Sequence, residues 1–284
     1  MSELQASTAA GYSPSPRPTF DVPTLITRKS VTRHIWGDAE SGEVMDWIYV
    51  SSDKIHALVF GLAPGGGFRH SPEFRTVFGA DELLHVLSGA MIIANPETGE
   101  VRHIDAGSSV FFRADTWHHA FAHGEQPLRV IEVFAPPPSN GTSGAYARTR
   151  PYLEHSNYEQ ELVGVPARAA DGASSFVHMR EADIAYRLDG NVLSGLLAAT
   201  EHLIVSSVSL SPSSRSAIHE HPGDEVVYGL TGRLIVRAWF GSQTFVFEAE
   251  PHDLVYLPQG TVHEYRNFEG ETATALVGVA PGVR

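Results

Sequence analysis

The sequence contains one short pattern twice, about half a chain apart. The segment E-L-L-H-V-L-S-G at residues 82–89 recurs as E-V-V-Y-G-L-T-G at residues 225–232, which is 143 residues later. His118 recurs in the same way as His263, 145 residues later. A nearly constant offset over several landmarks indicates a duplicated structural unit. We therefore expect this 284-residue chain to fold as two copies of one domain.

Each copy consists of short apolar runs that are separated by Gly, Pro, Asp and Asn. Runs such as W-I-Y-V, H-A-L-V-F-G-L and A-M-I-I-A are rich in branched and aromatic residues and are followed by turn residues. This pattern is typical of β-strands. No stretch repeats its apolar residues with the helical period over several turns, so we expect few and short helices. The sequence predicts an all-β sandwich or barrel.

Composition divides the chain into four parts. Residues 1–20 are rich in Ser, Ala and Pro and are expected to form a flexible leader, with an ordered arm as the alternative. The first domain is expected at residues 21–150 and the second at residues 174–284. The stretch between them, residues 151–173, is expected to be a linker.

Charge and cysteine content exclude several classes of function. The net charge of -13 argues against a nucleic acid partner, which requires clustered Lys and Arg. With no cysteine, the chain has neither disulfides nor thiolate ligands, so any metal must be held by His and carboxylate side chains. No window approaches the roughly 18 apolar residues of a membrane span, and the N-terminus lacks a signal-peptide pattern. We expect a cytoplasmic protein without a membrane partner.

Four potential metal ligands lie close together in the second copy. Side chains alternate along a strand, so His219 and His221 are expected on one face. Glu225 follows a Pro-Gly turn, and His263 comes from a later strand after P-Q-G. A single His in a β protein is commonly a surface or core residue, but this combination is far more restrictive. Three imidazoles and one carboxylate would leave coordination positions open for a substrate or dioxygen.

These ligands belong to two longer patterns. The pattern H-x-H-x(3)-E-x(6)-G is formed by His219, His221, Glu225 and Gly232. The pattern x(6)-P-x-G-x-x-H-x(3)-N is formed by Pro258, Gly260, His263 and Asn267, with His252 where a Gly is expected to open it. Both resemble the two motifs of the cupin superfamily, and the repeat makes the chain similar to a bicupin. The resemblance implies two tandem jelly-roll barrels and a metal held by the three His and the Glu of the C-terminal barrel.

The first copy keeps the frame of these motifs but loses part of the ligand set. Glu82 and His118 hold ligand positions, whereas Thr76 and Phe78 stand where the first two His are expected. We expect a degenerate domain that contributes packing and walls. The alternative is a weaker second metal site formed by His70, Glu82 and His118.

Other side chains are candidates for the substrate pocket on grounds of alternation alone. Tyr265 and Asn267 share a strand face with His263, and Tyr265 is the candidate proton donor. Arg237 and Trp239 share one face of their strand, where an inward Arg would suit a carboxylate or enolate. For Tyr265 and Asn267, ordinary barrel filling is the alternative, and for Arg237 and Trp239 the sequence does not determine which face of the strand points inward.

Three functions fit a bicupin with one complete site. The first, which we expect, is a dioxygenase acting on a small enol, diketone or aromatic substrate, because related bicupins often have that activity. The second is a Lewis-acid isomerase, epimerase, decarboxylase or lyase, and the third is a non-catalytic binding protein. Fe(II) is the expected metal, with Mn, Ni, Cu or Zn as alternatives. A homodimer is expected because sheet edges are often covered by a partner.

Overall fold

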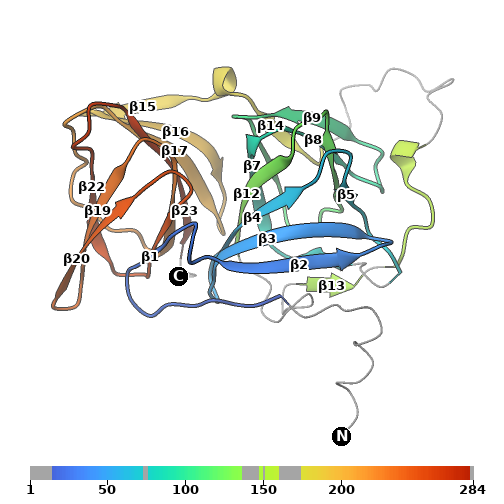
Figure 1. The fold of residues 1–284 in the computed structure, drawn as a ribbon, viewed down its shortest axis with the longest axis horizontal. Coiled ribbons are helices and arrows are strands. Elements are labelled where there is room, and N and C mark those ends of the chain that lie inside the picture. Colours follow the sequence, from blue (N-terminus) through green and yellow to red (C-terminus); the bar gives the residue numbers. More distant parts are fainter. Residues whose placement is uncertain (1–14, 73–75, 136–146, 150, 160–173, 282–284) are drawn as a thin grey trace, which may run out of the picture.

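Two β-barrels lie side by side in the structure (Figure 1), a computed structural model that describes residues 15–72, 76–135, 147–149, 151–159 and 174–281. The helices of this described part are three-residue 3-10 turns, η2 (Asn157–Glu159) and η3 (Glu181–Asp183). None of the described helices has the length and apolar character that crossing a membrane requires. The prediction of an all-β pair of tandem jelly-roll barrels with few short helices is confirmed.

The N-terminal barrel is built around one large and one small sheet. Its strands are β2 (Thr32–Asp38), β3 (Gly42–Ser51), β4 (His56–Leu62), β5 (Gly67–Phe68), β6 (Thr76–Phe78), β7 (Asp81–Ser88), β8 (Ala90–Ala94), β9 (Val101–Asp105), β10 (Ser109–Phe112), β11 (His119–His123), β12 (Leu128–Ala135), β13 (Ala147–Thr149) and β14 (Val177–Met179). The large sheet has the order β14-β10-β7-β12-β4-β3-β2, and the small one β5-β11-β8-β9. β6 and β13 form a separate pair.

The C-terminal barrel repeats this arrangement. Its strands are β1 (Thr24–Ile26), β15 (Tyr186–Asp189), β16 (Val192–Ala199), β17 (Ile204–Leu210), β18 (Gly223–Thr231), β19 (Leu234–Phe240), β20 (Gln243–Ala249), β21 (Leu254–Leu257), β22 (Val262–Arg266) and β23 (Ala273–Pro281). The large sheet has the order β1-β21-β18-β23-β17-β16-β15, and the small one β20-β19-β22.

The two barrels exchange one strand each. β1 precedes the N-terminal barrel in the chain but pairs with β21 of the C-terminal barrel, with Leu25 opposite Val255. β14 follows the linker but pairs with β10 of the N-terminal barrel, with His178 opposite Val110. The domain boundaries expected at residues 21 and 174 therefore do not coincide with membership of the sheets.

The described ends of the expected leader and linker are bound to the barrels. Arg17 donates a hydrogen bond to Ser51 at 3.2 Å, and the ring of Phe20 lies 6.1 Å from that of Tyr256. These contacts contradict a fully flexible leader over residues 15–20; residues 1–14 lie outside the described part. In the expected linker, Glu159 forms a 2.6 Å ion pair with Arg69, while residues 160–173 are not described.

The central strands of the two large sheets are buried on both faces, and they supply three apolar cores. One core fills each barrel. The third lies between the barrels, where the outer faces of the large sheets pack on each other. Adjacent residues therefore belong to different cores: Leu83 on β7 faces the other barrel, whereas Leu84 faces the interior of its own. This explains why central strands such as β4 and β23 are almost continuously apolar.

Substitution of two motif glycines distinguishes the cost of backbone strain from the cost of steric crowding. Gly232 and Gly260 both have positive φ, at +64° and +82°. A Cβ on Gly232 would lie 2.7 Å from the carbonyl oxygen of Thr272, whereas a Cβ on Gly260 would have no described atom within 4 Å. We expect Gly232→Ala to lower the free energy of unfolding by about 3 kcal/mol and Gly260→Ala by about 1 kcal/mol. Urea denaturation measures both, and equal losses would contradict the crowding argument.

A buried histidine links the stability of the N-terminal barrel to pH. His56 stacks on Phe134 at 4.4 Å, and neither ring nitrogen makes a hydrogen bond within the described structure. Burial, and then the charge of Arg17, lower the pKa of His56 to about 3. Because this pKa lies below the ordinary value of 6.5, the unfolded chain binds the proton first as pH falls, and stability is lost below about pH 6.5.

We therefore expect His56→Phe to protect the fold in mild acid. Between pH 7 and pH 5 the native protein should lose about 2 kcal/mol more than the variant, from the proton taken up by His56 on unfolding. Urea denaturation at the two pH values measures this difference. Parallel losses in both proteins would show that His56 is not kept neutral by the fold.

Candidate metal centre

The four ligands predicted in the second copy lie together in the C-terminal barrel. One ring nitrogen each from His219, His221 and His263 can be chosen so that all lie within 4.8 Å of one another. Glu225 Oε2 lies 3.3 Å from His263 Nε2 and 3.5 Å from His221 Nε2. The four side chains therefore converge on one point.

Strand pairing brings these residues together. Glu225 is on β18, where it pairs with Leu257 and Val279 and shares their inward direction. His219 and His263 form an antiparallel bridge with two backbone hydrogen bonds, of 2.9 and 2.8 Å. Residues that face each other in such a bridge project to the same side. The H-x-H segment is thereby fixed against β22 and opposite Glu225.

Backbone carbonyls orient two of the imidazoles. His219 Nδ1 donates a hydrogen bond to the oxygen of Ala217 at 2.9 Å, and His263 Nδ1 donates one to Thr261 at 3.0 Å. Because a carbonyl can only accept, Nδ1 carries the proton in both rings. The lone pair of each Nε2 is then available, which is the arrangement that metal-binding histidines require.

Two buried atoms at the centre have no hydrogen-bond partner in the described structure, and their chemistry shows whether a cation would fit between them. Glu225 Oε2 and His263 Nε2 are both buried, and neither has a hydrogen-bond partner within the described structure. A buried polar group without a partner costs about 1–3 kcal/mol. A carboxylate oxygen opposite an imidazole lone pair is a repulsive contact that a divalent cation between them would reverse. The donor set and these two atoms therefore fit a divalent metal.

Tyr265 holds the other oxygen of Glu225. Its hydroxyl donates a hydrogen bond to Glu225 Oε1, while its ring lies 5.3 Å from that of His263. Burial, and then the Glu225 charge, raise the pKa of Tyr265. Burial alone would raise the pKa of Glu225, but the neighbouring His263 and the other donors outweigh it and lower that pKa. The geometry keeps Glu225 ionised and its free oxygen turned to the histidines.

The sequence-based placement of Arg237 and Trp239 in the pocket is wrong. β19 pairs with β22 so that Ala238 faces His263, whereas Arg237 faces Glu264. Arg237 therefore lies on the outer face, 3.6 Å from Glu264, with its guanidinium over the Trp239 ring. Alternation correctly put the two side chains on one face, but it could not tell which face was inward.

Asn267 is also not a pocket residue. Its side chain is completely buried and donates hydrogen bonds to the carbonyl oxygens of Leu210 and Glu271, at 3.0 and 2.6 Å. Its oxygen accepts a hydrogen bond from the backbone of Glu269. Asn267 ties the turn between β22 and β23 to β17, which is a structural role.

Apolar residues that sequence reasoning missed form the wall beside Glu225. Val279 pairs with Glu225 and with Ile204 of β17, and all three face inward. In the next inward row, Leu196 and Val277 flank Ser206. Ile204 and Leu196 are 36% and 52% exposed, so apolar surface is accessible at this end of the barrel. Alternation from Glu225 could find these residues only with the strand pairing known.

The N-terminal barrel does not assemble the second site in the expected form. Glu82 and His118 do lie together, but their third neighbour is Glu132, not His70. The ring of His70 is turned away, with Nδ1 2.9 Å from His119 Nε2 and its centroid 4.0 Å from that of Trp117. The grouping of His70 with Glu82 and His118 is therefore wrong.

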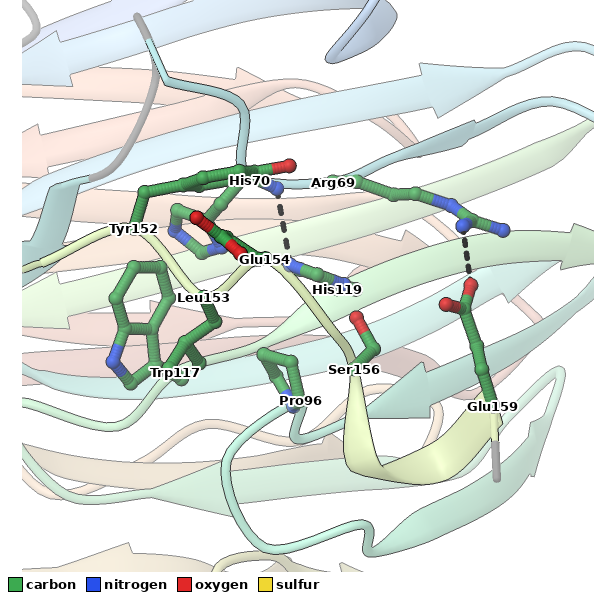
Figure 2. A pocket seen from close by; sticks show the side chains of 10 residues that line it. All are labelled: Arg69, His70, Pro96, Trp117, His119, Tyr152, Leu153, Glu154, Ser156 and Glu159. Atoms are coloured by element: carbon green, nitrogen blue, oxygen red, sulfur yellow. Dashed lines mark hydrogen bonds and ion pairs between the residues drawn. The ribbon is translucent and has the colours of Figure 1, made fainter. Parts of the chain in front are cut away.

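Figure 2 shows where His70 lies instead. It lines a cavity of about 80 Å³ together with Trp117, His119 and Tyr152, under the segment that continues to Glu159. The cavity belongs to the N-terminal barrel and contains none of the candidate metal ligands. Its two histidines hydrogen bond to each other, and His119 Nδ1 also contacts the Tyr158 hydroxyl at 2.7 Å.

Comparisons with known proteins agree with this architecture. The Cupin_2 family model, a cupin domain, matches residues 60–134 and again residues 206–279. A search of curated proteins finds no match.

Among solved structures, an oxalate decarboxylase–formate complex from Lactobacillus farciminis is similar at 13% identity with a TM-score of 0.67, over 94% of this chain and 88% of that one. A Bacillus subtilis oxalate decarboxylase at pH 4.6 is 12% identical with a TM-score of 0.65, over 93% and 78%. Another structure of the Bacillus subtilis enzyme, from a study of its Mn(II) centres, is 11% identical with a TM-score of 0.65, over 94% and 80%. At these identities the similarity shows the fold.

The ligand assignment predicts different effects for two histidines. His221→Ala removes a donor from the C-terminal cluster and should lower metal occupancy of that site at least tenfold at limiting metal, whereas His119→Ala should leave it unchanged. Elemental analysis of both variants, purified without added metal, measures the metal bound per chain, and only His221→Ala should lose the ion of the C-terminal site. Equal occupancy in the two variants would overturn the assignment.

Proposed function

This chain belongs to the cupin family, with one cupin domain at residues 60–134 and another at residues 206–279, and on that premise we propose that its C-terminal barrel is a divalent-metal enzyme for a small-molecule substrate. His219, His221, Glu225 and His263 would hold the metal. The observation that carries this proposal is the convergence of four donors, two of whose buried atoms have no hydrogen-bond partner in the described part of the chain.

The reaction that the surroundings of the site favour is dioxygenation of an enol, diketone or aromatic compound. A metal bound there would polarise substrate oxygens and, if it is Fe(II), exchange electrons with dioxygen. The protein wall beside the ligands is apolar, with Val277, Val279, Ile204 and Leu196 on its inner face. Such a wall suits a substrate with apolar flanks next to its oxygens.

The side chains around the ligands would position the site and hold a proton. Tyr265 fixes one oxygen of Glu225, so only the second oxygen is directed at the histidines. Its hydroxyl stays protonated because burial and Glu225 raise its pKa. His221 is accessible, with 33% of its side chain exposed, whereas His263 and Glu225 are each 1% exposed, so substrate would approach from the His221 side. The expected homodimer and cytoplasmic location stay predictions.

A second candidate is a Lewis-acid decarboxylase or another lyase acting on a small acid. The similar solved structures favour it, since they are described as oxalate decarboxylases and one study concerns Mn(II) centres. The apolar wall beside the ligands favours a decarboxylase less than it favours a dioxygenase. A small dianion is best met by cationic side chains, and the arginine expected there, Arg237, lies on the outer face.

Oxygen uptake and carbon dioxide release separate the two candidates. Protein stripped of metal is reloaded with Fe(II) or Mn(II) and incubated with a β-diketone, a catechol, a flavonol and oxalate. We expect the Fe(II) protein to consume dioxygen with at least one of the first three compounds, because their apolar flanks fit the wall. His221→Ala should lose this activity and His119→Ala should keep it.

Two outcomes would count against the dioxygenase. One is the absence of oxygen uptake with all three apolar compounds in fully loaded protein. The other is release of carbon dioxide from oxalate by the Mn(II)-loaded protein at the same rate under nitrogen as in air. This result would establish the decarboxylase instead.

A further inference from the structure

A cluster of ionisable side chains lies inside the N-terminal barrel, at the place that corresponds to the candidate metal centre. One carboxylate oxygen each from Glu82 and Glu132 and one ring nitrogen of His118 lie within 4.8 Å of one another. Glu82 and His118 occupy the places of Glu225 and His263. Glu132 belongs to neither cupin motif.

The position of Glu132 follows from the strand register. On β12, Phe134 pairs with Glu82, and Glu132, two residues earlier, points to the same inner side. In the other barrel, Val279 pairs with Glu225, and the residue two positions earlier is Val277. The N-terminal barrel therefore has a carboxylate where the C-terminal barrel has an isopropyl group. Two imidazoles of the motif are replaced there by a single carboxylate from another strand.

His118 is oriented as a ligand would be. Its Nδ1 lies 3.4 Å from the carbonyl oxygen of Thr116, the same relation that His263 has with Thr261. The contact is long, but with Nδ1 directed at this carbonyl, Nε2 is the ring nitrogen left for a ligand. The rings of Phe112 and Phe68 pack on His118 at 4.7 and 5.7 Å and hold it in place.

One oxygen of Glu82 has no partner. Glu82 is 1% exposed, and its Oε2 makes no hydrogen bond within the described structure. An ionised carboxylate in apolar surroundings requires a counter-charge, and a second carboxylate beside it increases the repulsion. A cation bound between the two carboxylates would satisfy the unpartnered oxygen and remove this repulsion.

We propose that the N-terminal barrel binds a second divalent cation through Glu82, Glu132 and His118. Two carboxylates and one imidazole form an oxygen-rich set, which suits Mn(II) better than the imidazole-rich set of the C-terminal barrel does. The competing arrangement is a proton shared by the two carboxylates with no metal. The two arrangements differ in the number of ions that the chain binds.

Metal stoichiometry in paired variants tests this site. The full-length protein is stripped with a chelator and titrated with Mn(II), and the bound metal per chain is counted by elemental analysis and by the EPR signal of free Mn(II). We expect two ions per chain in the native protein, one in Glu132→Gln, one in His221→Ala and none in the double variant. His119→Ala, which alters the residue next to His118 but not the cluster, should keep two.

A second readout protects the test against misfolding. Glu132→Val copies the residue that the C-terminal barrel has at this position and should fold without metal. In the His221→Ala background, Mn(II) should raise the melting temperature of the protein, and adding Glu132→Val should abolish that rise.

Two results would overturn the proposal: equal Mn(II) binding by the native protein and Glu132→Gln, or complete loss of binding in His221→Ala alone. Neither bears on the proposed enzyme, which depends on the C-terminal ligands. Conversely, if the C-terminal barrel proves to be inactive, we still expect one Mn(II) ion per chain in His221→Ala.

Discussion

The burial of both faces of the central strands in the two large sheets is the constraint on which the rest of the structure depends. Val226 packs in the core between the barrels, and the next residue, Val227, packs in the core of its own barrel. Glu225 therefore lies in a part of β18 that has no solvent-facing side. Its carboxylate is 1% exposed and must find its counter-charge inside the barrel. Tyr265 binds one oxygen of Glu225, and a cation held by the histidines would supply the counter-charge, so fold and site follow from the same burial.

Much of the site could be predicted from the sequence because it depends on local spacing and on the repeat. The H-x-H alternation and the Glu that follows its turn place three ligands, and the offset of 145 residues identifies His263 through His118. The facing of Arg237 could not be predicted, because it depends on which residue of β22 pairs with β19. The sheets to which β1 and β14 belong could not be predicted for the same reason. Local composition does not indicate that a strand pairs with the other barrel.

Where the sequence departs from the cupin motifs, the backbone conformation of the turns is kept, but the set of metal ligands is not. His252 stands where the second motif opens with Gly, yet it adopts φ +72° and donates its backbone hydrogen bond to Gly229 at 2.8 Å. Gly107 makes the equivalent bond to Val86, also at 2.8 Å, with φ +83°. Asp115, which replaces the later Gly, also keeps a positive φ of +66°. The turns therefore hold the same shape in both barrels, while the loss of two histidines alters the donor set itself.

The two donor sets would give their metals different charges, and this difference fits their surroundings. A divalent cation with three neutral imidazoles and one carboxylate keeps a net charge of about +1, which attracts an anionic substrate oxygen. With two carboxylates and one imidazole the charge is close to zero, which lowers the cost of burial in an apolar core. The charged set includes His221, whose side chain is one-third exposed, and the neutral set includes Glu82, which is almost completely buried. Charge and access together favour chemistry in the C-terminal barrel and a stabilising ion in the N-terminal one.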